Sequence, residues 1–238
     1  MRINNRKYNE LRKIIIQRNY NKYAEGSVLI SYGNTKVICT ASIVNGVPKF
    51  LKGTGYGWLT AEYNMLPRST KERIVRENNK IKTSGRSQEI QRLIGRSLRA
   101  AINLKKIGEI TIYIDCDVIQ ADGGTRSASI TGSCIALFDA LKKMKYNKLN
   151  EIVKYLVASV SLGISKEKVI LDLDYKEDSN TEVDMNIVMN EKHEFIEIQG
   201  SAEKKALKEN ELKKIIELSK EGIKKIINIQ KKILLKSI

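Results

Sequence analysis

Two runs of apolar and β-branched residues near the N-terminus predict a pair of strands. Residues 27–32 and 35–43 flank Gly33-Asn34, a two-residue turn that is typical of a β-hairpin. Between residues 44 and 79 the pattern is lost among glycines, two prolines and a charged run. We expect an irregular loop there, and a loop this long in a compact chain is usually functional or disordered.

From Ser84 the apolar period changes to that of an amphipathic helix. Ser84 is a typical N-cap residue. Apolar residues follow it at spacings of three and four, at Ile90, Leu93, Ile94, Leu98, Ala101 and Ile102. Residues 109–119 then alternate, which predicts a strand with one apolar face. A glycine turn at 120–126 leads into a second helix, which we expect to begin near Ser127.

The second half repeats this order loosely. Residues 156–164 are apolar and β-branched, 169–175 predict a strand, and 182–189 and 195–199 predict a hairpin. Residues 210–235 predict a long amphipathic helix. Strands, two helices, more strands and one terminal helix indicate an α+β fold. Because no linker, repeat or low-complexity tract interrupts the chain, we expect a single domain over residues 1–238.

Composition removes several kinds of chemistry. The chain of 238 residues has one histidine, which excludes sites built on several histidines. Its three cysteines, Cys39, Cys116 and Cys134, lie far apart in apolar surroundings, so we expect buried thiols and no zinc site. With no apolar run of about 18 residues and no signal-like start, we expect a cytoplasmic protein without a membrane span.

The net charge of +16 favours an anionic partner such as a nucleic acid. A generic basic surface is the alternative, because abundant Lys, Ile and Asn can also reflect coding bias. The charge pattern alone leaves both interpretations open.

One anion site is predicted at the start of the second helix. Gly123 and Gly124 allow a tight turn, the helix N-terminus adds partial positive charge, and Arg126 adds a guanidinium fork. Together they suit a phosphate or sulfate group. The turn lacks the P-loop pattern, so it gives no reason to expect ATP. A plain glycine connection is the alternative.

The first helix carries further arginines. Arg86 stands at its start in a similar setting, so the two helix starts could converge on one anion. Arg92, Arg96 and Arg99 recur off the apolar stripe. They predict either a solvated helix face or a basic wall beside an RNA strand.

An acidic segment follows the strand predicted at 169–175. Asp178 and Asp184 are paired carboxylates of the kind that a hard divalent cation such as Mg²⁺ accepts together with water and substrate phosphate. An acidic surface turn is the alternative. Asp115 and Asp117 lie on the outward side of a predicted strand, and for them we expect a structural role.

Several long motifs, in order from Arg2 to the terminal helix, resemble the bacterial ribonuclease PH family. They read GWLTAEYNMLPRST, SGRSQEIQRLIGRSLRA, IDCDVIQADGGTRSASITG, EDSNTEVDMNIVM and FIEIQGSAE. The resemblance implies an α+β fold with a βαβα core, mixed sheets and a long C-terminal helix. It also implies a homo-hexameric ring, a trimer of dimers.

The activity that the resemblance implies is phosphate-dependent 3′–5′ exoribonuclease action. Inorganic phosphate would be the co-substrate and nucleoside diphosphates the products, with a reverse reaction that adds nucleotides. The expected substrates are the 3′ ends of tRNA precursors, with rRNA 3′ ends as a further class. The expected cofactor is Mg²⁺ or Mn²⁺.

The resemblance also assigns roles to residues of this sequence. Phosphate binding falls on Arg86, Gly124, Thr125 and Arg126, and a catalytic role on Arg126, Asp178 and Asp184. The same two aspartates support the metal. The loop that grips tRNA falls on Arg68, Arg73 and Arg76, and Arg92, Arg96 and Arg99 are further candidate RNA contacts.

Departures from the family pattern are mild. The related polynucleotide phosphorylases have a lysine where this chain has Asn186, so the metal shell here would use more water. Serines replace Thr or Ala at 87, 97 and 127, and the turn at 190–193 replaces a glycine-containing one. No charged site residue is lost, which favours an active enzyme. An inactive RNA-binding ring subunit and a basic ribonucleoprotein component remain the other hypotheses.

Overall fold

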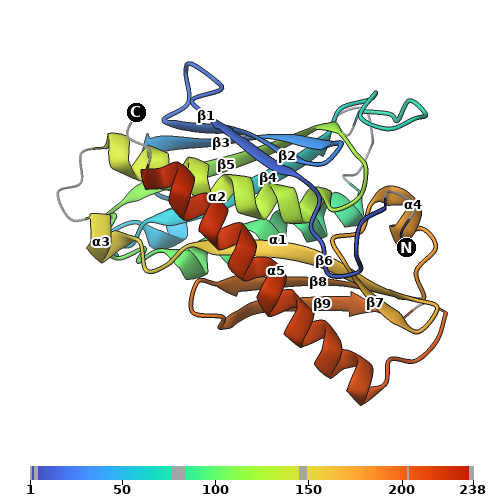
Figure 1. Cartoon of the computed structure of the whole chain (residues 1–238). Helices are drawn as coiled ribbons and strands as arrows, with labels where there is room; N and C mark the ends of the chain where they lie inside the picture. Colours follow the sequence, from blue (N-terminus) through green and yellow to red (C-terminus); the bar gives the residue numbers. More distant parts are fainter. Residues whose placement is uncertain (1, 3–4, 77–83, 145–148, 203, 236–238) are drawn as a thin grey trace.

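Two β-sheets with helices packed on them make up the protein (Figure 1). The computed structural model describes residues 2, 5–76, 84–144, 149–202 and 204–235. The first sheet has the strand order β1-β2-β3-β5-β4 and the second β7-β6-β8-β9. The strands of the first sheet are β1 (Ile14–Arg18), β2 (Gly26–Tyr32), β3 (Thr35–Asn45), β4 (Trp58–Met65) and β5 (Ile110–Gln120). Those of the second are β6 (Val157–Ser165), β7 (Lys168–Leu171), β8 (Val183–Asn190) and β9 (Phe195–Ser201).

The expected βαβα core is present in the first sheet. Strand β4 runs parallel to β5, and α1 (Gly85–Ala101) makes the crossover between them. Helix α2 (Thr125–Lys143) follows β5 directly. The predicted hairpin is also confirmed, because β2 and β3 pair antiparallel around Gly33, whose φ of 56° is easy for glycine.

The prediction of an irregular loop from 44 to 79 was wrong in part. A short 3₁₀ helix (Lys49–Leu51) and the whole of β4 lie within it. Leu59, Ala61 and Tyr63 do alternate toward the core, but Glu62 and Asn64 are weak strand formers. The strand forms because its eight residues pair in register with Thr111–Val118 of β5.

Helix α2 lies between the sheets and is buried on almost every side. It packs against β2 and β3 of the first sheet and β6 of the second. Its small residues permit close approach on both faces. At the β2 side, a Cβ on Gly26 would lie 1.8 Å from the carbonyl oxygen of Ala136. The main chains of β2 and α2 therefore touch, which leaves no room for a side chain.

The second sheet departs from prediction at β7. The strand expected at 169–175 ends at Leu171, because Asp172 takes a left-handed φ of 56°. Asp174 then caps α4 (Tyr175–Asp178), accepting a hydrogen bond from the backbone of Glu177 while the Glu177 side chain accepts one from the backbone of Asp174. This capping box starts a helix at Tyr175, the last residue of the predicted strand.

The long predicted terminal helix is confirmed as α5 (Glu209–Leu235), which lies across β6 and β7 (Figure 1). The buried Gln230 amide donates to the carbonyls of Thr131 in α2 and Val157 in β6, both at 3.0 Å. One hydrophobic cluster joins both sheets with α1, α2 and α5. A short helix, α3 (Leu149–Ile152), precedes β6. Within the described ranges, no helix has the length and apolar character needed to span a bilayer.

Candidate active site

A polar cavity of about 600 Å³ lies where the first turns of α1 and α2 face the second sheet. Its lining includes five residues that the sequence singled out, namely Arg86, Gly124, Arg126, Asp178 and Asp184. These residues come from four separate elements and from both halves of the chain. The fold therefore brings the predicted anion site and the predicted acidic segment to one place.

The wall formed by the helix starts carries the positive charge. Ser84 caps α1, accepting a hydrogen bond from Ser87 N at 3.2 Å as predicted, and this places Arg86 in the first helical turn. Gly124 is the N-cap of α2 and has a φ of 66°. Within the described residues, the guanidinium of Arg86 has no hydrogen-bond or ion-pair partner. That charge is available for an anionic ligand.

Arg126 is held in place by residues that sequence reasoning missed. Its Nη1 donates to Gln199 Oε1 of β9 at 2.8 Å, and Gln199 Nε2 donates to Glu89 Oε1 of α1 at 2.5 Å. Glu89 Oε1 also lies 3.7 Å from Arg126 Nη1. Glu89 follows Arg86 by one helical turn, which is a usable sequence signal. Gln199 stands far away in sequence and gives none.

Tyr63 of β4 contacts the start of α2, which carries Arg126, and sequence reasoning did not identify it either. Its hydroxyl and Thr125 Oγ1 are 2.8 Å apart, so Thr125 faces the phenol and does not line the cavity. Burial raises the pKa of Tyr63, although the Thr125 hydrogen bond and the charges of Arg86 and Arg126 oppose the rise.

The opposite wall is acidic. Asp178 ends α4, while Asp184 and Asn186 stand two apart on β8 and so share one face of the strand. Two carboxylates and an amide oxygen are the hard donors that Mg²⁺ takes, and this ion usually keeps several waters. Among the described residues, no three His, Cys, Asp or Glu side chains form a complete metal shell. Asp178, Asp184 and Asn186 could supply only part of a shell for such an ion, and water and substrate would have to supply the rest.

The predicted RNA loop lies outside the cavity. Its base is fixed beside the end of β5, where Leu66 N donates to Val118 O at 3.0 Å and Ala121 N donates to Ser69 O at 2.8 Å. Arg68 donates to the carbonyl of Lys71 at 2.8 Å, and the side chains of Arg73 and Arg76 are exposed. The rest of this loop, 77–83, lies outside the described residues.

The three arginines along α1 have different surroundings. Arg92 is exposed, whereas Arg96 forms a two-fold ion pair with Glu197 of β9 at 2.7 and 3.0 Å. Arg99 donates to Leu59 O at 3.0 Å and stacks 5.2 Å from the ring centre of Trp58. Two of the three therefore already have partners within the chain. A role for them in RNA binding stays a prediction.

Asp115 and Asp117 lie on the far side of the first sheet from the helices. The neighbouring Cys116 side chain faces α2, where its sulfur is 3.1 Å from Ser133 Oγ, so the two aspartates point the other way. Burial raises the pKa of both carboxyls, and the charge of Asp115 adds to the rise at Asp117. Neither aspartate lines the cavity.

Asp117→Asn should stabilise the protein at pH 7, by roughly 0.5 kcal/mol. A raised folded-state pKa means that ionisation, which occurs as pH rises above the usual 3.8, is less favourable in the folded protein than in the unfolded chain. The gain should therefore vanish near pH 3, where the wild-type carboxyl is protonated. Urea unfolding at both pH values measures it. An equal gain at both would show that the effect is not electrostatic.

Comparison with known proteins gives the same fold and a family. The model of the 3′ exoribonuclease family, domain 1, matches residues 10–143, and that of domain 2 matches residues 155–222. Rrp46 of rice (Oryza sativa) is 19% identical with a TM-score of 0.80, over 98% of this chain and 100% of that one. The Archaeoglobus fulgidus exosome "with RNA bound to the active site" is 22% identical with a TM-score of 0.77, over 99% and 92%. An archaeal exosome core is 23% identical with a TM-score of 0.77, over 97% and 91%.

The solved structures share the fold at low identity, whereas the two family models match the sequence itself. Together the matched segments cover most of the chain, and they divide it between α2 and β6. The cavity receives residues from both matched segments. The chain belongs to the 3′ exoribonuclease family.

Proposed function

We propose that the protein is a phosphorolytic 3′–5′ exoribonuclease of the ribonuclease PH type. One observation carries the proposal: a single cavity holds two arginines and a glycine helix start opposite a pair of aspartates. The first wall suits inorganic phosphate. The second would hold a divalent cation, which would offset the negative charge that develops when a phosphodiester is attacked.

Phosphate would bind between Arg86, Arg126 and the turn at Gly124. These donors offset the repulsion between the two anions that must meet, phosphate and the terminal RNA phosphodiester. An oxygen of inorganic phosphate attacks, in line, the phosphorus on the 5′ side of the 3′-terminal nucleotide. The bond from that phosphorus to the 3′ oxygen of the preceding nucleotide breaks. The 3′ oxygen takes a proton, and the terminal nucleotide leaves as a nucleoside diphosphate. No covalent enzyme intermediate is needed.

Asp178 and Asp184 would hold a Mg²⁺ or Mn²⁺ ion in this reaction. When bound, the ion neutralises charge on the reacting phosphates. As an alternative to metal binding, Asp184 would assist transfer of the proton to the 3′ oxygen. The phosphodiester bond that breaks is replaced by the phosphoanhydride bond of the diphosphate, so phosphorolysis is close to thermoneutral and we expect the reverse reaction to add nucleotides from diphosphates.

For the substrate we propose the 3′ ends of tRNA precursors and rRNA. The net charge of +16 and the exposed arginines of the 66–76 loop favour a polyanion larger than the cavity itself. Similarity in fold to an exosome core and to an exosome with RNA bound supports assembly into a ring. We propose a homo-hexamer in which loops from neighbouring subunits hold the RNA.

The decisive experiment incubates the protein with a tRNA carrying a 3′ extension and Mg²⁺, with and without inorganic phosphate. We expect degradation with phosphate and nucleoside diphosphates as products. Monophosphates formed at the same rate without phosphate would replace the proposal with hydrolysis. RNA binding without any degradation would instead favour the RNA-binding ring subunit.

Replacing Arg68, Arg73 and Arg76 together by alanine should weaken tRNA binding and flatten its salt dependence. Each lost phosphate contact removes about 0.7–0.9 from the slope of log K against log salt, so three contacts remove roughly 2–3. Degradation of a short single strand should change little, because such a substrate does not reach the loop. Equal losses on the two substrates would place these arginines in catalysis or folding. Filter binding across a salt series provides the measurement.

A further inference from the structure

The side chain of Arg12 lies behind the cavity lining, where it contacts the turn before α2 and Asp172, in the segment before α4. Its Nε and Nη2 donate to the two carboxylate oxygens of Asp172 at 3.1 and 2.7 Å, and its backbone N–H donates to the same carboxylate at 2.7 Å. Its Nη1 donates to the carbonyl of Asp122 at 2.6 Å. Only 5% of the Arg12 side chain and 1% of that of Asp172 are exposed. Arg12 thus ties the turn before α2 to the segment before α4.

This contact fixes the direction of the peptide groups in the turn. The Asp122 carbonyl accepts from Arg12, and the Gly123 carbonyl accepts from Thr35 Oγ1 at 2.6 Å. In a trans peptide the C=O and N–H point in opposite directions, and the described residues contain no cis peptide. The N–H groups of Gly123 and Gly124 therefore point away from Arg12 and Thr35. Within the described chain, neither N–H has a hydrogen-bond acceptor.

The Gly123-Gly124 turn is packed closely against the segment at Leu173 and against Arg12. A Cβ on Gly123 would lie 2.7 Å from the carbonyl oxygen of Leu173, and one on Gly124 would lie 2.8 Å from Arg12 Nη2. Main chain and guanidinium are thus in direct contact with both glycines. A shift of Arg12 or of the segment at Leu173 must move the turn with it.

Arg2 holds the acidic wall in a similar way. Its Nε donates to Glu177 Oε1 at 2.6 Å, and its two Nη atoms donate to the carbonyls of Leu171 and Asp172 at 2.8 and 2.9 Å. Arg6 adds a contact of 3.3 Å from Nη2 to Glu177 Oε2. Glu177 is the residue before Asp178, so these contacts fix the helix that carries a cavity carboxylate.

We propose that Arg12 is a positioning residue for phosphate: it holds the Gly123-Gly124 turn so that Gly124, which lines the cavity, presents its N–H group to the ligand. Its own charge is neutralised by Asp172, so it acts through the turn and does not bind phosphate itself. Arg2 and Asp172 complete the device by holding the acidic segment at a fixed distance from the turn. The inference rests on the proposed function, because it assumes that the ligand of this turn is inorganic phosphate.

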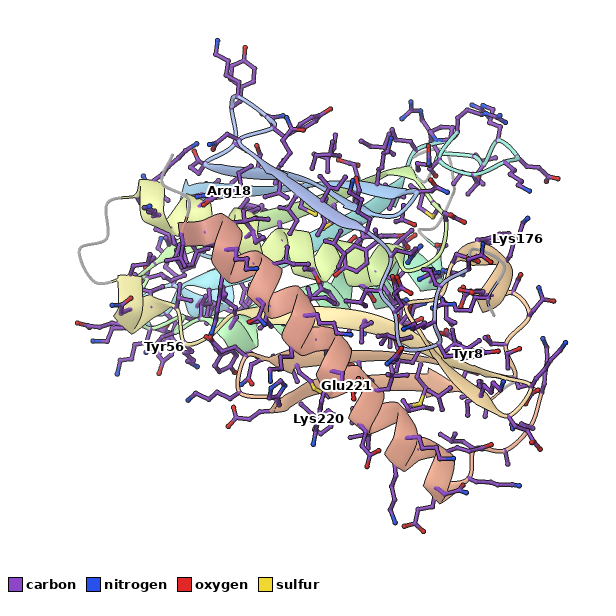
Figure 2. All side chains as sticks on the ribbon, viewed as in Figure 1. Tyr8, Arg18, Tyr56, Lys176, Lys220 and Glu221 are labelled. Carbon is purple, nitrogen blue, oxygen red and sulfur yellow. The ribbon has the colours of Figure 1, made fainter. Side chains whose placement is uncertain are left out.

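The test compares Arg12→Lys with Arg18→Lys as a matched control. Arg18 is a half-buried arginine that likewise donates to both oxygens of one carboxylate, Asp139, and to a carbonyl, that of Ile233. It lies at the opposite end of the molecule from Tyr8 and Lys176, which mark the N-terminal segment and α4 (Figure 2). Both variants keep a positive charge and lose the fork, so their Tm values should fall by similar amounts.

Phosphate affinity should separate the two variants. We expect Arg12→Lys to weaken binding of inorganic phosphate, measured by calorimetry without RNA, by about 10- to 100-fold, because the turn is misplaced. Its half-saturating phosphate concentration in degradation should rise by the same factor, with kcat reduced less. Arg18→Lys should stay within about twofold of wild type. Unchanged phosphate affinity in Arg12→Lys, or an equal loss in Arg18→Lys, overturns the inference.

Two further results keep the inference apart from the proposed function. A wild-type protein that binds phosphate but releases monophosphates would contradict phosphorolysis and leave the positioning role intact. A wild-type protein that binds no phosphate would overturn both. If Arg12→Lys does not fold, Thr35→Val removes two hydrogen bonds of the turn, to the Gly123 carbonyl and from the Asp122 N–H, while keeping the side-chain shape. It should also weaken phosphate binding, and unchanged affinity there overturns the inference as well.

Discussion

Asp184→Asn should lower the maximal rate of phosphate-dependent degradation by about 10²- to 10³-fold, as expected when a preorganised charge at the reacting centre is lost. The half-saturating phosphate concentration should change by less than about twofold. Arg86, Gly124 and Arg126 form the other wall of the cavity and keep their places in the variant. Binding of tRNA should persist, because the exposed loop at 66–76 is untouched.

The measurement is initial rate against phosphate concentration at several Mg²⁺ concentrations. Asp115→Asn is the matched control, since it makes the same change on a strand of the first sheet outside the cavity. Its rate should equal that of wild type. A near-normal maximal rate for Asp184→Asn at saturating Mg²⁺ would mean that Asp184 has no catalytic part.

Gly26→Ala should destabilise the protein by about 3 kcal/mol, which is the upper range for overpacking a core. The new methyl group would lie 1.8 Å from the carbonyl oxygen of Ala136 and 2.9 Å from the backbone nitrogen of Ala140. Both are main-chain atoms of α2, so no side chain can rotate aside. Either β2 or the whole helix has to shift.

Gly85→Ala is the control for this substitution. Among the described residues, apart from its chain neighbours and the backbone of its own helix, no atom lies within 4 Å of the position that its Cβ would take. Gly85 begins α1, where alanine is a better helix former. It should be neutral or slightly stabilising in urea unfolding. Similar midpoints for the two variants would show that the β2–α2 contact tolerates a side chain.

Local signals predicted much of the fold. The Gly33-Asn34 turn and the Ser84 cap are interactions between near neighbours, and the structure confirms both the hairpin and the helix that they predict. Strand β1 was not predicted, because Ile14, Ile15 and Ile16 form an apolar run with no alternation. Strand β4 was missed for the opposite reason: it alternates weakly and depends on pairing with β5, about fifty residues away in sequence.

The residues of the candidate site also fall into two groups, those that lie in a local motif and those that depend on contacts with distant parts of the chain. Arg86, Arg126, Asp178 and Asp184 stood out because each sits in a short motif with recognisable chemistry, and the structure places all four in one cavity. Their catalytic and binding roles stay predictions. Gln199 and Tyr63 had no such motif. Gln199 matters through its contact with Arg126, 73 residues away in sequence, and Tyr63 through its contact with Thr125, 62 residues away.

The cavity draws its walls from distant parts of the chain, and this has a consequence for the protein during its synthesis. The arginine wall is complete in sequence by Arg126, but Asp178, Asp184 and Gln199 leave the ribosome only later. A nascent chain that has folded its first sheet still lacks both carboxylates and the Gln199 contact of Arg126. With the roles proposed above, cleavage of RNA would begin only after most of the protein has been made.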